Sequence, residues 1–136
     1  MKFLKRMFAS KEVKAILGVL DEADQRFDCR AFEMVKNQIE QAVLSLPDGF
    51  AQKIRNGISP RQCVYSMIAN IAGELLASGK FHLFPGTLNP LPFSGGLDLL
   101  RIFDAAVDEM VQIGAVDKDN AVAHKARMRD TIKTEG

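Results

Sequence analysis

Cysteine is scarce in this sequence. The 136 residues contain two, Cys29 and Cys63, with no CxxC pair and no cluster of cysteine with histidine. Disulfide-stapled domains and structural zinc sites are built from such clusters. The sequence therefore favours free thiols in a reducing compartment, and we expect a cytoplasmic protein with no metal and no cofactor.

Long apolar runs are missing as well. A helix that spans a bilayer needs about 18 or more apolar residues in succession. The apolar run AILGVL at 15–20 is far shorter and lies between Lys14 and Asp21. The basic start of the chain also lacks the apolar stretch and the cleavage site of a signal peptide. The sequence therefore predicts no transmembrane segment.

The chain has little net charge, +1 at pH 7. A near-neutral chain has no global field that would attract nucleic acid, although local patches remain open. One such patch is KFLKRMF at 2–8, where basic and apolar residues alternate. It could touch an anionic membrane surface, or dock on an acidic helix of this chain or of a neighbour. Otherwise we expect residues 1–9 to be flexible or peripheral to the fold.

Helical periodicity is the strongest positive signal. Apolar residues recur at helical spacing and few segments alternate with a period of two, which is typical of an all-α protein. The pattern predicts a single domain over residues 1–136, a bundle of four to five principal helices. The first helix is expected to begin after Ser10. The others are expected at about 28–46, 60–78, 97–113 and 118–132, and a short helical stretch is expected before Gly57.

The helix expected at 60–78 is the most apolar and is predicted to be central. Ser59 is a suitable N-cap, Pro60 suits the first helical position, and Gln62 completes a capping box, while Gly79 would end the helix. Polar residues recur every four positions and form one stripe: Gln62, Ser66, Asn70, Glu74 and Ser78. We interpret this stripe as the part of the helix that reaches water. The alternative is the lining of a polar groove, with Glu74 as a proton acceptor or cation ligand.

The segment FHLFPGTLNPLPFSGG at 81–96 combines three prolines with many apolar side chains. Its prolines and glycines argue against a helix, and its apolar content argues against a solvated loop. We expect a long ordered connection over about 80–96 whose apolar residues are buried, either on the core of the same chain or on a second copy. The candidate contact residues are His82, Phe84, Leu88 and Phe93.

Three other features carry less functional weight. FSGGLD at 93–98 lacks the spacing of a phosphate-binding loop. Cys63 lies near the start of a helix, where a thiol pKa can fall, but a buried and inert thiol is the more common case. Asp104 and Asp108 lie one helical turn apart without the histidine partners of a di-metal bundle, so we predict no metal site.

Three functions are compatible with these observations. The first is a non-enzymatic helical binding or assembly module that self-associates, or binds a protein partner, through the apolar surface near 81–96. The alternative is a small ligand-binding protein or enzyme with a pocket between helix 60–78 and the 81–96 segment, and its candidate residues are Cys63, Asn70, Glu74 and His82. The third is a nucleic-acid-binding regulator that uses the basic residues of helix 118–132. No catalytic residues are predicted. Of the three hypotheses, the second is the one that includes an enzyme.

Overall fold

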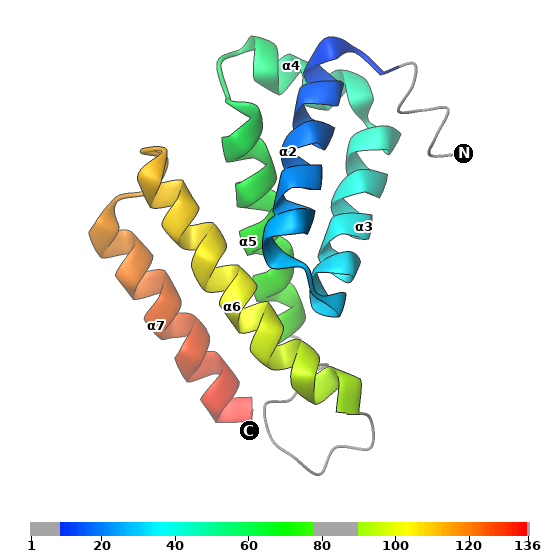
Figure 1. Ribbon diagram of the computed structural model, residues 1–136. Helices are drawn as coiled ribbons and strands as arrows, with labels where there is room; N and C mark the ends of the chain where they lie inside the picture. Colours follow the sequence, from blue (N-terminus) through cyan, green and yellow to red (C-terminus); the bar gives the residue numbers. More distant parts are fainter. Residues whose placement is uncertain (1–8, 78–89, 136) are drawn as a thin grey trace.

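The computed structural model of the protein describes residues 9–77 and 90–135, with side chains described for 9–77 and 98–130. Within these ranges the chain is helical throughout, with short turns and no strand (Figure 1). The all-α prediction is therefore confirmed. The helices are α2 (Lys11–Phe27), α3 (Arg30–Ser45), α4 (Pro47–Arg55), α5 (Pro60–Ala77), α6 (Pro90–Gln112) and α7 (Lys118–Glu135).

The predicted helix caps are present in α2 and α5. The Ser10 hydroxyl accepts a hydrogen bond from the Val13 N–H at 3.3 Å, and Ser59 accepts one from the Gln62 N–H at 3.0 Å. Each serine satisfies a backbone donor that has no partner inside its helix. The predicted starts of both helices are thus confirmed, while Gly79, the expected end of α5, lies outside the described residues.

Helices α3 and α4 follow each other without a loop. The second long helix, predicted at about 28–46, ends before Pro47, which begins α4 as its first residue. Proline is tolerated there because the N–H that it lacks would have no partner in any case. The short helical stretch expected before Gly57 therefore starts earlier than the sequence suggested.

Helix α6 corrects the prediction for the segment 81–96. The helix begins at Pro90, so residues 90–96 are helical and are not part of a connection. Pro90 and Pro92 fall in the first turn, where backbone N–H groups have no acceptor inside the helix and proline's fixed φ is suitable. Residues 81–89 lie outside the described part of the chain, and so does the N-terminal segment 2–8.

A tight turn joins α6 to α7. Gly114 adopts a positive φ of 78°, and the N–H groups of Ala115 and Val116 both donate to the carbonyl oxygen of Met110. Asp117 then caps α7, its carboxylate accepting from the Asn120 N–H at 2.8 Å. The turn sends α7 back along α6 as its neighbour (Figure 1).

Helix α5 is the centre of the molecule. It contacts α2, α3, α6 and α7, and in Figure 1 it lies between the α2–α3 pair and the α6–α7 pair. The central position predicted for this helix is observed. Among the described side chains, the largest fully buried ones belong to α2, α3, α5 and α6 and include Ile16, Phe32, Tyr65, Ile68 and Ile102.

A polar network closes the interface of α2, α5 and α6. The Glu109 carboxylate accepts hydrogen bonds from Arg26 at 3.0 Å and from Arg61 at 3.2 Å, and only 12% of its side chain is exposed. Arg26 also donates to the hydroxyl of buried Tyr65 at 3.1 Å, which raises the pKa of this arginine above its ordinary value. Arg61 pairs in addition with the exposed Glu22. The network links residues up to 83 positions apart in the chain.

Helix α7 is bound differently from the others. In its described side chains Ala121 alone is buried, and Val122 is 61% exposed. Instead, Lys125 and Arg129 form ion pairs with Asp108 and Asp104 of α6. The two aspartates that lie one turn apart on α6 therefore pair with basic side chains of α7.

Candidate binding groove between α5, α6 and α7

Two adjoining cavities lie where α5, α6 and α7 meet. Their volumes are about 190 Å³ and about 340 Å³, and both are lined by Ala69, Asn70, Phe103 and His124. Because they share these four residues, the cavities form one groove, which we call the α5–α7 groove. It extends along α5 from Ser66 to Ala77, about three helical turns or 16 Å.

The wall from α5 consists of short side chains. Ser66, Ala69, Gly73 and Ala77 lie three or four positions apart, which places them on one helix face. An added Cβ on Gly73 would lie 3.2 Å from Met128 Cε and 3.3 Å from Phe103 Cε1. The absence of a side chain at Gly73 therefore lets α6 and α7 approach α5 closely at this point.

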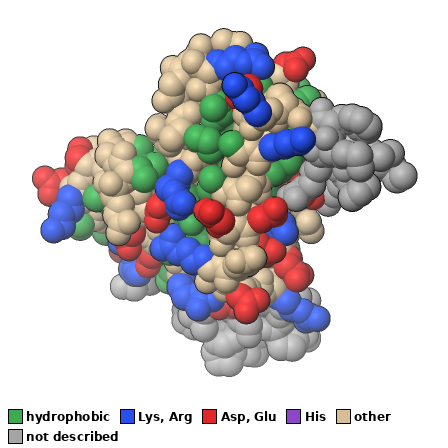
Figure 2. All heavy atoms as spheres, turned by 45° about the horizontal axis from the view of Figure 1, so that its top comes forward, with side chains coloured by type: hydrophobic (Ala, Val, Ile, Leu, Met, Phe, Trp, Pro, Cys, Tyr) green, Lys and Arg blue, Asp and Glu red, His purple; other side chains and the backbone are tan. Residues whose placement is uncertain are grey.

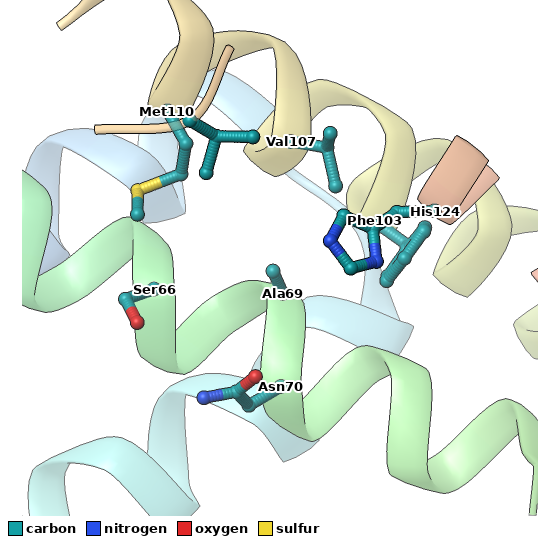
Figure 3. A pocket seen from close by; sticks show the side chains of 8 residues that line it. Ser66, Ala69, Asn70, Phe103, Val107, Met110 and His124 are labelled. Carbon is teal, nitrogen blue, oxygen red and sulfur yellow. The ribbon is translucent and has the colours of Figure 1, made fainter. Parts of the chain in front are cut away.

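The floor of the groove comes from α6 and is apolar. Phe103, Val107 and Met110 follow one another at helical spacing, and each is at least nine-tenths buried. Figure 3 shows Ala69 pointing from α5 towards this row. A floor of this kind can bind apolar side chains, and methionine adapts its shape to what it contacts.

The third wall is α7, which supplies polar groups. His124 and Arg127 line the groove, and the Arg127 guanidinium donates to Nδ1 of His124 at 3.1 Å. Glu74 stands on the α5 side, so the two walls carry groups of opposite charge. All three side chains are exposed, and water weakens each interaction that they make.

The structure brings together only part of the predicted site. Asn70 and Glu74 both line the groove, and both are exposed, so the polar stripe of α5 reaches water and borders a groove at once. His82, Phe84 and Leu88 lie outside the described residues. Phe93 lies in α6, but its side chain is also outside the described ones.

Cys63 has no part in the groove. Its side chain is buried and lines neither cavity, and burial raises the pKa of its thiol by disfavouring the charged thiolate. A raised pKa opposes a role as nucleophile at neutral pH. Among residues 9–77 and 98–130, no three side chains of the metal-binding types stand close enough together to hold an ion.

Sequence reasoning missed the contribution of α7. His124 and Arg127 were noted only as members of a basic helix that could face phosphate, and the pocket was expected beside the 81–96 segment. The sequence did not predict where α7 packs. Its position on α6 is marked by the ion pairs of Lys125 with Asp108 and of Arg129 with Asp104. These ion pairs use two of the basic side chains on which the nucleic-acid hypothesis relied.

The surface charge is mixed. On the face shown in Figure 2, acidic and basic side chains of the described residues are interspersed and do not gather by sign. The helices in the described ranges are also too short or too polar to cross a bilayer.

Comparison with protein-family models, with curated proteins and with solved structures found no match for this chain.

Proposed function

We propose that this chain is a non-enzymatic helical binding module, and that the α5–α7 groove is where it receives an amphipathic helix of a protein partner. The observation that carries the proposal is the row of Phe103, Val107 and Met110, which lies beneath a groove that α7 does not fill. Amphipathic helices bind to apolar grooves through side chains three or four positions apart.

The shape of the groove supports a helix as the occupant. Its length of about three turns matches the contact stripe of a short helix, and the short side chains of Ser66 and Ala69 leave open space above the apolar row. Self-association through the segment 81–96 stays a separate prediction that no described residue tests.

Filling the groove tests this function. Ala69 lines both cavities. Ala69→Phe should therefore weaken the binding of 1-anilinonaphthalene-8-sulfonate at least tenfold, because the aromatic rings of this anionic fluorescent dye bind in apolar grooves. Titration of the folded protein with the dye gives the affinity, and thermal melts verify that the variant is folded.

Ala15→Phe is the matched control, because it adds the same side chain to an exposed position of α2. Ala77→Phe is a second groove variant, at the outer end of the larger cavity. Equal dye binding by Ala69→Phe and Ala15→Phe would contradict the proposal, and so would undiminished binding by both groove variants.

A further inference from the structure

The contact face of α7 is poorly suited to the surface that it covers. A helix that packs on an apolar surface normally presents apolar residues at positions i, i+3, i+4 and i+7. In α7 that series is Ala121, His124, Lys125 and Met128. Ala121 is buried in the core and Met128 packs against it, whereas His124 lines both cavities above the apolar row. The groove therefore lies where this face of α7 presents a polar side chain.

Charge complementarity makes up for this poor fit. Asp104 and Asp108 lie one turn apart on α6, beside the apolar row, and Arg129 and Lys125 lie one turn apart on α7. The two helices thus carry charges of opposite sign at the same spacing of one turn. Their attraction is weak, because half-exposed ion pairs are screened by water and salt. Beside the apolar contacts of Ala121 and Met128, α7 is thus held by ion pairs that another basic helix could replace.

We infer that α7 occupies the docking surface of the partner, and that the partner is a basic amphipathic helix that displaces α7. Such a helix repeats the two basic residues four positions apart, opposite Asp104 and Asp108. It places a large apolar side chain where α7 has His124, which lines both cavities. The inference rests on the proposed function, since it names the partner of the same apolar row on α6.

Displacement has a thermodynamic consequence. Helix α7 is tethered by a short turn and therefore competes at a high effective concentration. The apparent affinity of the partner equals its intrinsic affinity multiplied by the fraction of molecules in which α7 is undocked. Any change that loosens α7 without altering α6 must tighten partner binding.

Two double variants of the full chain separate this inference from its alternatives, because both break the same two ion pairs. Lys125→Ala with Arg129→Ala loosens α7 and leaves the aspartates for the partner. Asp104→Asn with Asp108→Asn loosens α7 as well but removes the charges that the partner needs. The probe is a fluorescein-labelled synthetic 18-residue helix with leucine in its apolar stripe and two lysines four positions apart, measured by fluorescence anisotropy at low salt.

We expect the first double variant to bind the probe about tenfold more tightly than the unchanged chain, because its competitor is weakened. We expect the second to bind it about tenfold more weakly, because the complementary charges are gone. A probe in which glutamate replaces both lysines should bind the unchanged chain more weakly than the lysine probe. The single variant Lys125→Ala should also bind the probe more tightly, and Asp108→Asn more weakly, each by less than its double variant. These single variants replace a double variant that does not fold.

Shifts of the same sign in both double variants would overturn the inference, because the aspartates would then only hold α7 closed. Equal binding of the lysine and glutamate probes would overturn it too. If neither probe binds any variant while Ala69→Phe still abolishes dye binding, the inference fails and the proposed function stands. If Ala69→Phe and Ala15→Phe bind the dye equally, the proposed function itself fails.

Discussion

Replacing Phe32 by alanine is expected to lower the free energy of unfolding by about 3–5 kcal/mol, as truncation of a buried phenylalanine does. Phe32 lies on α3 with no exposed surface, and its ring centroid is 5.0 Å from that of Phe27. The variant loses the transfer free energy of the ring and also leaves a cavity, because the surrounding helices relax only in part. Urea denaturation of both proteins measures the difference.

Leu46→Ala is the control for this prediction. Leu46 lies between α3 and α4 and is 66% exposed, so its truncation should change the free energy of unfolding by less than about 0.5 kcal/mol. Similar losses in the two variants would show that the α2–α3–α5 side of the molecule is not its core.

The second large effect is expected at Glu109. Glu109→Ala should cost about 1–3 kcal/mol of unfolding free energy, about the contribution of one hydrogen bond to a charged group, because water replaces part of the two bonds that are lost. The cost stays below that of a fully buried pair because Arg26 and Arg61 are each about two-fifths exposed and regain water. Thermal and urea denaturation at low and high salt measure it.

Glu22→Ala is the matched variant, since Glu22 pairs with the same Arg61 but is 66% exposed. Its removal should change stability by no more than about 0.5 kcal/mol, as expected for a surface ion pair. An equal loss from the two variants would mean that the network around Tyr65 does not hold α2, α5 and α6 together.

Local sequence signals predicted most of the fold. Ser10, Ser59 and Asp117 mark helix starts by a chemistry that acts within three residues, and all three cap their helices. The start of α6 at Pro90 differs from the prediction because the number of prolines in the segment 81–96 does not decide whether a helix can begin there. Their position matters more, since Pro90 and Pro92 both fit a first helical turn.

The site was predicted less well than the fold. The periodicity of α5 alone places Asn70 and Glu74 on one stripe, so the α5 wall could be found from sequence. The α6 floor and the α7 wall could not, because they depend on which helices meet. The same holds for Glu109, whose two arginine partners lie 83 and 48 positions away.

The central claim is that α7 covers an apolar surface of α5 and α6 incompletely and is held there by ion pairs. Hydrogen exchange at the backbone amides of α7, followed as the salt concentration rises from about 0.05 M to about 1 M, tests it most directly, because salt at the upper end screens exposed charges within about 3 Å. The account predicts that α7 exchanges faster than α5 at low salt and faster still at high salt, while the protection of α5 stays unchanged. Amides of α7 that are as protected as those of α5, and that do not respond to salt, would contradict it.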